Sequence, residues 1–428
     1  MNWALLLSAL FFSVSTAAVL GAALGLTGLL LLHFGAGGAT ALAVPAVTNV
    51  FMDFTLSAVP LFILLGDILL ASGVSRRVYN GLTPLFHRIP GQLLHTNIAV
   101  STVFGAVSGS STSTAAAIGS VAYPELSRRG YDRGIVVGSL AAGGTLGLLI
   151  PPSLSLLIYG ATQNVSIGKL FLAGIIPGIL LALAFSAYML ILAKLRPAIT
   201  PKAEKAPSWS EIGRGLLSIW PLPVLIFCVL GTIYMGLATP TEAAGIGVAV
   251  ALILGFTWGD LTLPKLWGAL ISTTQIFGAI AMVMVGTLIL AQAVSILGMP
   301  QDIVRMFTDL GLSKYEVLLL IILIYLFLGC FFDGISLLLM TLPITFPLMM
   351  SMGFDPIWFG VIVTILMEIG MITPPVGLNL FVLTTITGNE VSLARTARAT
   401  LPFWLIMVGS IGVFTLFPEI ILFLPSFY

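Results

Sequence analysis

Long apolar stretches separated by short polar segments fill the 428-residue chain from end to end. A helix of about 20 apolar residues is long enough to cross roughly 30 Å of hydrocarbon. The pattern predicts nine crossings, near residues 4–32, 51–72, 134–150, 168–193, 216–236, 241–258, 267–297, 357–372 and 402–424. The first stretch has no basic start and exceeds the apolar part of a signal peptide, so we expect it to remain as a helix.

Two more apolar segments, residues 92–124 and 316–349, are interrupted near their middle by glycine and small polar residues. Arginines flank the first segment on both sides, at Arg76, Arg77, Arg88, Arg128, Arg129 and Arg133. Because loops rich in Lys and Arg stay in the cytoplasm, both flanks are expected there. Only an even number of passes joins two cytoplasmic flanks, so residues 92–124 are predicted to form a re-entrant helical hairpin.

When the membrane passes are counted onward along the chain, residues 316–349 are predicted to form a second hairpin, which enters from the periplasmic face. This count places the N-terminus and the polar linker 194–215 in the cytoplasm, and the C-terminus in the periplasm. All but three of the 17 basic residues then lie on the cytoplasmic side, as the charge bias of membrane proteins requires. The exceptions are Lys169, Arg305 and Lys314.

The two halves on either side of this linker repeat one layout. In the first half, Ser108-Gly109 lies in the hairpin, and the sequence GLLIPP begins 39 residues after Ser108, at Gly147. In the second half, Asp333-Gly334 lies in the hairpin, and GMITPP begins 37 residues after Asp333, at Gly370. Since the hairpins enter from opposite faces, the halves are predicted to be inverted-topology repeats, an arrangement typical of secondary transporters.

Each pair of prolines is expected to break its helix and leave carbonyl groups without partners inside the membrane. Irregular backbone at that depth is tolerated where it lines a hydrated cavity, and a bound cation such as sodium is one way to satisfy it. The candidate ligands are Ser108, Ser110, Gly147, Ile150 and Pro152 in the first half, and Gly329, Asp333, Gly370, Thr373 and Pro375 in the second.

The hairpin tips also bring helix N-termini and backbone amides together, which favours a bound carboxylate. The candidate substrate residues at that place are Gly109, Ser111, Thr145, Gly334 and Asn379. Structural interpretations stay open, because small residues permit close helix packing and paired prolines also make simple kinks. Asp333 in particular fits a cation ligand, a proton carrier or a cap of the hairpin tip.

Five more acidic residues lie in or beside apolar runs, namely Asp53, Asp67, Glu242, Glu368 and Glu419. Most of them are near predicted helix ends, where snorkelling or helix capping accounts for a carboxylate. Glu368 is the exception, because it precedes Gly370 by two residues and lies close to the predicted helix break. It is a candidate to pair with a basic group or to tune a site.

Composition excludes several classes of protein. The chain is 58% hydrophobic and 8% charged, with a mean hydropathy of +1.14, whereas a soluble domain has roughly 25% charged residues. The basic residues are scattered rather than gathered in a stripe, which argues against nucleic-acid binding. Cys228 and Cys330 lie inside apolar runs without a CxxC pair, so disulfide and zinc chemistry are not expected.

At these motifs the sequence resembles the large membrane subunit of the tripartite ATP-independent periplasmic (TRAP) transporters, over essentially its whole length. The matching stretches are PLFILLGDILLASG (60–73), GAVSGSSTSTAAAIG (105–119), GLLIPPS (147–153), ATPTEAAG (238–245), GCFFDGISLLLMTLPITFP (329–347) and GMITPPVGLNLF (370–381). The resemblance implies an elevator mechanism in the bacterial inner membrane, with sodium cages at the two sets of candidate ligands. It implies two or more sodium ions and no organic cofactor.

The resemblance also implies two partners in the lipid bilayer and periplasm, a small four-helix membrane subunit (Q type) and a periplasmic substrate-binding protein (P type). The small subunit is expected from a separate gene, because the chain opens with its first crossing. The family's substrates are small organic acids such as sialic acids and C4-dicarboxylates. The chain is therefore expected to be a transporter and not an enzyme.

The expected organisation combines this resemblance with the hydropathy pattern, in an all-α polytopic membrane protein with an elevator-type fold. Its parts are N-terminal scaffold helices (1–91), first-half transport elements (92–166, with the hairpin 92–124 and a broken helix 134–162), scaffold helices (167–315, with the linker 194–215), second-half transport elements (316–386, with the hairpin 316–349 and a broken helix 357–386) and a C-terminal helix (387–428).

Three other functions share part of this sequence pattern. A stand-alone sodium/carboxylate symporter has the same hydropathy, and a neighbouring gene for a binding protein would separate the two. An intramembrane serine hydrolase would use His95 and Ser108, but 13 helical residues separate them by roughly 20 Å, too far for proton transfer. A passive channel conflicts with two half-paths that enter from opposite faces.

Overall fold

The computed structural model describes residue 8, residues 19–201 and residues 207–428. Within those ranges every regular element is a helix and no strand occurs, which confirms the prediction of an all-α protein. The first part of the predicted crossing 4–32 lies outside the described residues. The helices of the first half are α2 (Leu20–Leu30), α3 (Ala43–Met52), α4 (Ala58–Ala71), α5 (Val74–Phe86), α6 (Leu93–Ser108), α7 (Ser111–Arg128), α8 (Arg133–Thr145), α9 (Leu154–Gln163) and α10 (Ile167–Leu195).

The second half holds longer helices together with short connecting ones. They are α11 (Trp209–Ser218), α12 (Pro221–Ile226), α13 (Thr232–Tyr234), α14 (Pro240–Thr257), α15 (Leu263–Ile296), α16 (Met299–Asp309), α17 (Lys314–Gly329), α18 (Gly334–Ser351), α19 (Pro356–Met371), α20 (Leu378–Ile386), α21 (Leu393–Leu416) and α22 (Glu419–Leu422).

Six of the described spans are long and apolar enough to cross a membrane, and a seventh results if the bent pair Thr40–Met52 and Thr55–Ala71 counts as one. The chain is therefore a multi-pass membrane protein. The predicted crossing 51–72 is wrong at its start, because the chain bends by 55° between the two helices of that pair. Asp53 stabilises the bend, since its Oδ1 accepts the N–H of Thr55 at 2.8 Å.

Two other predicted boundaries differ from the structure. The linker 194–215 contains the start of α11, because Ser208 and Glu211 form a capping box that begins a helix at Trp209. The last predicted crossing, 402–424, begins nine residues earlier at Leu393 and ends at Leu416. Arg395 and Arg398 lie in its first turns, and these charges kept the apolar pattern from revealing its start.

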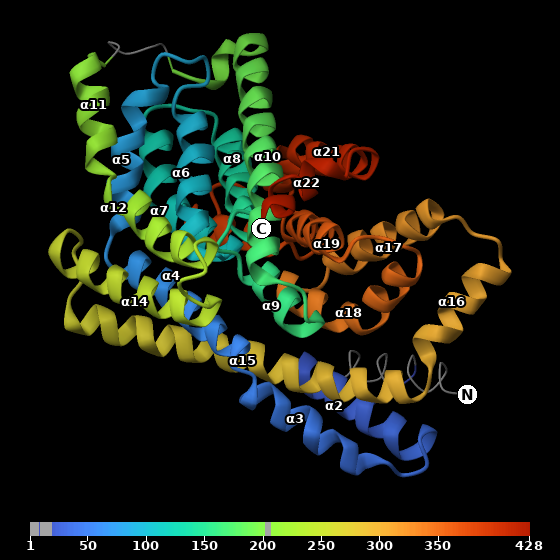
Figure 1. Cartoon of the computed structure of the whole chain (residues 1–428). Helices are drawn as coiled ribbons and strands as arrows, with labels where there is room; N and C mark the ends of the chain where they lie inside the picture. The colour runs from blue at the N-terminus through green and yellow to red at the C-terminus, as the bar shows by residue number, and fades with distance from the viewer. Residues whose placement is uncertain (1–7, 9–18, 202–206) are drawn as a thin grey trace.

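The longest helix, α15, has 34 residues and is about 51 Å long at 1.5 Å per residue. A helix that exceeds the roughly 30 Å of hydrocarbon must tilt strongly to stay within it. In Figure 1, α15 runs across one end of the molecule, transverse to α10, and α2 and α3 pack along it. α4 and α14 lie on its other side, so these helices form one layer.

Two groups of helices pack on this layer. α5 to α8 stand side by side with α10, and α17, α18 and α19 form a second group that reaches α9 and α10 (Figure 1). Each group contains a pair of helices joined by a short turn, α6–α7 in the first and α17–α18 in the second. We call these pairs the first hairpin and the second hairpin.

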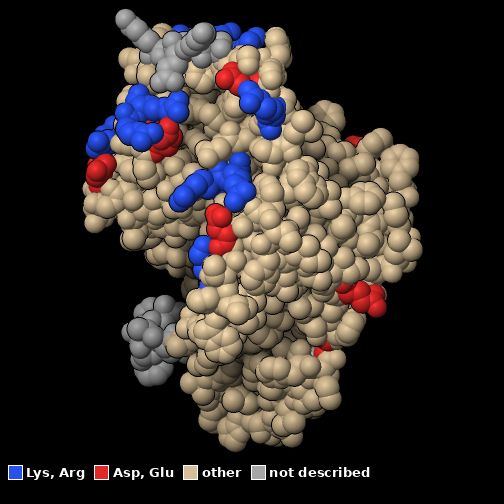
Figure 2. Space-filling model, turned by 90° about the vertical axis from the view of Figure 1, so that its left-hand side faces the viewer, with Lys and Arg blue, Asp and Glu red and all other residues tan. Residues whose placement is uncertain are grey.

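Charged side chains gather at one end of the molecule. Figure 2 shows Lys and Arg in the upper part of one face, together with some acidic residues, while the lower part is almost uncharged. Ion pairs among the described residues include Arg77 with Asp260 at 3.2 Å and Arg129 with Glu125 at 2.7 Å. The asymmetry is the one expected when basic loops lie on one side of a membrane.

Close contact between α2 and α15 depends on glycine. A Cβ added at Gly286 of α15 would lie 2.0 Å from the carbonyl oxygen of Gly21. We predict that Gly286→Ala pushes α2 away and destabilises the protein by about 1–3 kcal/mol, the usual cost of overpacking. Thermal denaturation of the purified protein measures this effect.

Gly278→Ala on the same helix is the matched control, because nothing lies within 4 Å of the added Cβ. It is expected to be neutral or slightly stabilising, since Ala favours helix. A Gly286→Ala variant that melts as high as Gly278→Ala would contradict the tight contact.

Candidate functional site

The first hairpin turns over at Gly109, between the end of α6 and the start of α7. Gly109 has a φ of +61°, which glycine adopts without strain, and its N–H donates to the Gly105 carbonyl oxygen at 2.9 Å. Ser110 then caps α7, because its Oγ accepts the N–H of Ser113 at 3.4 Å. The tip thus turns within two residues, and the backbone amides of the first turn of α7 lie at the end of the hairpin.

Three oxygen atoms cluster at this tip. Ser108 Oγ lies 2.7 Å from Thr114 Oγ1, and Thr114 Oγ1 donates to the Ser110 carbonyl oxygen at 2.7 Å. Gly147 packs directly against them, since a Cβ added there would lie 2.9 Å from Thr114 Oγ1 and 3.2 Å from the Ser110 carbonyl oxygen. The structure therefore brings Ser108, Ser110 and Gly147 together, and it adds Thr114, which the predicted ligand set omits.

Gly147 lies just before the first break. α8 ends at Thr145, a short 3-10 turn covers Leu146–Leu148, and α9 begins at Leu154 after the paired prolines. The side chain of Ile150 packs toward α10, because a Cβ added at Gly178 would lie 2.5 Å from its Cγ1. Among the predicted ligands of this set, Ile150 could therefore contribute only its backbone.

The second hairpin meets its own broken helix, α19–α20, in a similar way. A Cβ added at Gly370 would lie 2.8 Å from Gly329 Cα, just as one added at Gly105 would lie 2.6 Å from Gly147 Cα. Each half therefore has a pair of glycines at which hairpin and broken helix touch backbone to backbone. Thr373 lies just after the end of α19, and its Oγ1 donates back to the Ile369 carbonyl oxygen of that helix at 2.5 Å.

One backbone hydrogen bond joins each tip to the segment after the prolines. The N–H of Leu154 donates to the Gly109 carbonyl oxygen at 3.4 Å, and the N–H of Val376 donates to the Cys330 carbonyl oxygen at 3.0 Å. Both Pro-Pro peptide bonds are cis. Each hairpin tip and its broken helix thus satisfy one another's free backbone groups, as a membrane interior requires.

The structure changes one predicted correspondence between the halves. Sequence spacing pairs Ser108 with Asp333, yet Asp333 is the N-cap of α18, where its Oδ2 accepts the N–H of Ser336 at 3.0 Å. The N-cap of α7 is Ser110, so Ser110 and Asp333 have the same place in their hairpins. The spacing misleads because the second tip has a longer turn, which adds residues before Asp333.

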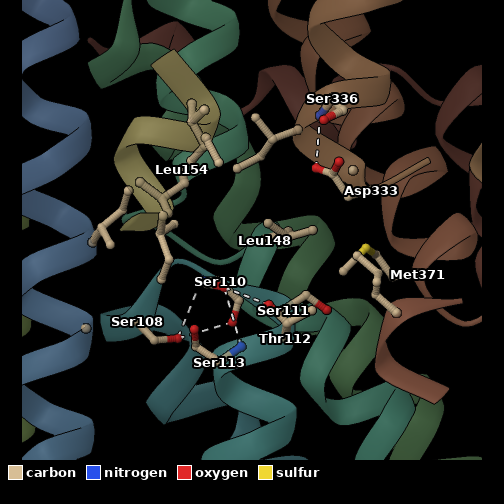
Figure 3. A pocket seen from close by; sticks show the side chains of 18 of the residues that line it. Ser108, Ser110, Ser111, Thr112, Ser113, Leu148, Leu154, Asp333, Ser336 and Met371 are labelled. Atoms are coloured by element: carbon tan, nitrogen blue, oxygen red, sulfur yellow. Dashed lines mark hydrogen bonds between the residues drawn. The ribbon is translucent and has the colours of Figure 1, made fainter. Parts of the chain in front are cut away.

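A cavity of about 320 Å³ lies between the two tips. Figure 3 shows the serine-rich tip of the first hairpin on one side, Asp333 and Ser336 on the other, and Leu148 between them. Ile63 and Asp67 of α4 and Ile276 and Ile280 of α15 complete the wall. The volume suits a small organic molecule, since ligand sites span roughly 300–1,000 Å³.

The predicted residues divide between this lining and the layer behind it. Those that line the cavity are Ser108, Ser110, Ser111, Asp333 and Gly334. Those outside the lining are Gly109, Thr145, Gly147, Ile150, Pro152, Gly329, Gly370, Thr373, Pro375 and Asn379. Thr145 is buried in α8, where its Oγ1 donates to the Ala142 carbonyl oxygen at 2.8 Å.

Asn379 connects the two halves. Its Nδ2 donates to Ser111 Oγ at 2.8 Å and to the Ala141 carbonyl oxygen at 3.2 Å, so α20 is held to both α7 and α8. The side chain is fully buried, and its Oδ1 has no hydrogen-bond partner in the part of the chain that the structure describes. Asn379 therefore orients Ser111 from behind the cavity wall.

Asp67 lies in the last five residues of α4, close to a helix end as most of the five acidic residues are expected to be. Its exposed fraction is 8%, and its Oδ2 accepts the Thr273 hydroxyl of α15 at 3.0 Å, a contact that the apolar pattern does not reveal. None of the ion pairs in the described residues involves Asp67. A carboxylate inside the apolar run 60–71 is the sequence signal that singles it out.

Glu368 is fully buried in α19, and neither carboxyl oxygen has a hydrogen-bond partner among the described residues. The expected pairing with a basic group is therefore not found there. A carboxyl group at this depth is costly unless it is neutral or meets a cation. Glu368 precedes Gly370 by two residues, so this buried carboxyl group lies beside the second helix break.

His95 and Ser108 stand at opposite ends of α6, so the hydrolase hypothesis has no support in the geometry. His95 Nε2 lies 2.8 Å from the Pro90 carbonyl oxygen, at the start of the helix. The 13 residues between His95 and Ser108 span about 20 Å. Ser108 instead contacts Thr114, as described above.

Comparison with known proteins matches residues 5–420 to the family described as "Tripartite ATP-independent periplasmic transporter, DctM component". The chain belongs to this family. A curated relative is the C4-dicarboxylate TRAP transporter large permease protein DctM of Pseudomonas aeruginosa, 36% identical over 374 residues, which cover 87% of this chain and 86% of the relative. The DctM-family chain is thus a TRAP transporter large permease, which confirms the expectation of a transport protein rather than an enzyme.

Other relatives carry different substrate names. The sialic acid TRAP transporter large permease protein SiaM of Vibrio cholerae is 33% identical, with 88% of this chain and 87% of the relative covered. The ectoine/5-hydroxyectoine permease protein UehC of Ruegeria pomeroyi is 35% identical, with 86% of each chain covered. Among solved structures, the Alcanivorax borkumensis YdaH transporter matches with a TM-score of 0.64 at 16% identity over 90% of both chains, which shows a shared fold.

The contacts of Asn379 in this DctM-family chain generate a prediction. Asn379→Ala removes both hydrogen bonds between α20 and the first half, and it leaves Ser111 Oγ without its donor. We predict a loss of about 1–3 kcal/mol of stability, typical for a buried polar network that loses one member. A lowered thermal midpoint measures it.

Asn80→Ala serves as the control, because Asn80 is an exposed residue of α5. It should leave the midpoint unchanged. If the two variants melt alike, Asn379 does not hold the halves together.

Proposed function

We propose that this permease carries a small organic acid across the bacterial inner membrane together with sodium ions. The cavity between the two hairpin tips is the observation that supports it. Serine hydroxyls and the first amides of α7 line one side, and the N-terminal end of α18 lines the other. Helix N-termini attract carboxylates, so an acid group can bind between them.

The oxygen atoms that cluster at the hairpin tips support the proposal that sodium ions bind there. Ser108 Oγ, Thr114 Oγ1 and the Ser110 carbonyl oxygen form one cluster, next to the free backbone of the first break. Hard cations take oxygen ligands, and unwound carbonyls are their usual partners in transporters. We place the second proposed sodium site at the corresponding position of the second half, beside Asp333 and the contact between Gly329 and Gly370.

The proposed movement is an elevator, in which the hairpins and broken helices slide along α4 and α15. These two helices contribute mainly apolar side chains to the cavity wall, such as Ile63, Ile276 and Val283. An apolar wall offers few directional bonds to break during sliding. Gly66 of α4 supports close passage, since a Cβ added there would lie 3.1 Å from the Ser108 carbonyl oxygen.

The proposal includes the partners that the family name and the relatives suggest. A periplasmic binding protein would deliver the acid, and a small four-helix membrane subunit would complete the scaffold. The names of the relatives, which include C4-dicarboxylate and sialic acid, favour a carboxylated metabolite as cargo.

The test is uptake of a radiolabelled C4-dicarboxylate or sialic acid into proteoliposomes that hold this chain and its small subunit. We expect uptake only when both a sodium gradient and the periplasmic binding protein are present. Sodium-driven uptake without the binding protein would support a stand-alone symporter instead. Uptake that ignores the sodium gradient would contradict the coupling.

Ser108 is the most specific target at the proposed first cation site. Ser108→Ala removes one oxygen of the cluster. We predict that half-maximal uptake then needs about tenfold more sodium, because the loss of one hydrogen-bond-sized contribution to the binding free energy weakens affinity by about that factor. Ser120→Ala is the matched control on the other helix of the same hairpin, because Ser120 is exposed and its hydroxyl donates to the Ala117 carbonyl oxygen of its own helix. An equal sodium requirement in both variants would remove Ser108 from the site.

The proposed orientation can be tested with single cysteines in a chain that lacks Cys228 and Cys330. Arg128→Cys is predicted to resist an impermeant thiol reagent in intact cells, because the charge bias places its loop in the cytoplasm. Lys314→Cys is predicted to react from outside, and both side chains are exposed. The opposite labelling pattern would invert the proposed topology.

A further inference from the structure

A basic groove lies where the C-terminal end of α10 meets the first turns of α8 and α21, and its volume is about 430 Å³. The polar and aromatic residues that line it are Asp132, Tyr188, Arg196, Arg395, Arg398 and Phe403. The hydrogen bond from the N–H of Asp132 to the Ile199 carbonyl oxygen, at 3.0 Å, holds the chain after α10 against the start of α8. The groove is thus built from three elements far apart in the sequence.

The charges in this groove do not cancel. Arg395 pairs with Asp132 at 3.2 Å, whereas Arg196 and Arg398 make no ion pair with any residue that the structure describes. Arg395 and Arg398 also lie near the N-terminal end of α21, where the helix dipole is already positive. The groove therefore has an excess of positive charge that nothing in the described chain offsets.

The groove also has an apolar side. Tyr188 and Phe403 pack edge to face with ring centroids 5.2 Å apart, and Met189, Leu192 and Pro402 continue the lining. Arg196 directly follows the long apolar helix α10, and Arg398 precedes the apolar part of α21. Both arginines therefore belong at a membrane surface, with apolar wall on the side of the hydrocarbon.

We propose that this groove binds the headgroup of an anionic phospholipid such as phosphatidylglycerol. The phosphate would lie between Arg196 and Arg398, and an acyl chain would follow the half-buried Tyr188 and Leu192. Arginine suits phosphate because its planar guanidinium donates two parallel hydrogen bonds. Basic pockets between membrane helices on the cytoplasmic side are a recognised site for such lipids.

The apolar wall is what favours a lipid over a free phosphate ion. A free anion would gain nothing from the half-buried side chains of Tyr188, Leu192 and Pro402, whereas an acyl chain would cover their apolar surface. The bound lipid would bridge α8, α10 and α21, because each contributes residues to the groove. It would thereby hold the start of the first broken helix against two neighbouring helices.

The experiment is a titration of the purified chain with its small subunit, followed by native mass spectrometry. The probes are dioleoyl phosphatidylglycerol, dioleoyl phosphatidylcholine and inorganic phosphate. Wild type is expected to bind phosphatidylglycerol in preference to phosphatidylcholine. The double variant Arg196→Gln with Arg398→Gln is expected to bind it about 25-fold more weakly, roughly fivefold for each charge near the surface.

The control removes two arginines elsewhere, through Arg77→Gln with Arg128→Gln. Both of these arginines form ion pairs, with Asp260 and Glu125, and lie outside the groove. The control should bind phosphatidylglycerol within about twofold of wild type. The pair Arg196→Lys with Arg398→Lys keeps the charge and should stay within about fivefold, which guards against a loss caused by misfolding.

Three outcomes would overturn the proposal. The first is equal affinity of the Gln double variant and the control for phosphatidylglycerol. The second is equal binding of phosphatidylcholine by the wild type. The third is displacement of phosphatidylglycerol by inorganic phosphate at comparable concentration, which would make the groove a site for free anions.

Discussion

Backbone groups inside a membrane must all find partners, and this constraint explains the centre of the molecule. Four elements break there, two at hairpin tips and two at paired prolines, and each break leaves polar backbone groups exposed. The bonds from Leu154 to Gly109 and from Val376 to Cys330 show how tip and broken helix satisfy one another. The glycine pairs Gly105–Gly147 and Gly329–Gly370 allow this contact, because a Cβ at Gly105 or Gly370 would lie only 2.6 or 2.8 Å from the Cα of the opposing glycine.

The cavity follows from that arrangement. Two tips that each dock on a broken helix present their helix N-termini toward a common space, and α4 and α15 close the remaining side. Asn379 joins the two halves from behind, so the groups that face the cavity are set by contacts across the whole centre. A permease of the TRAP family needs such a site to hold its cargo, and the proposal assigns that role to the space between the tips.

Sequence periodicity predicted the membrane class, the paired breaks and the residues Ser108, Ser110 and Gly147 that the structure brings together, because apolar length and paired prolines act locally. It did not predict the contribution of Thr114, which depends on how one turn of α7 folds back toward the end of α6. It also did not predict the contact of Asp67 with Thr273, because that contact joins residues 206 positions apart. The match of Ser110 to Asp333 required knowledge of which residue caps each helix, a property of the turn rather than of spacing.

Equilibrium binding of radioactive sodium to the purified chain and its small subunit counts the proposed cation sites. We predict about two sodium ions per chain in the wild type, one at each pair of hairpin tip and broken helix. Ser108→Ala and Asp333→Asn should each lose about one ion and keep the other, because the two places lie in different halves. A wild type that binds no sodium, or variants that bind as much as the wild type, would contradict this prediction.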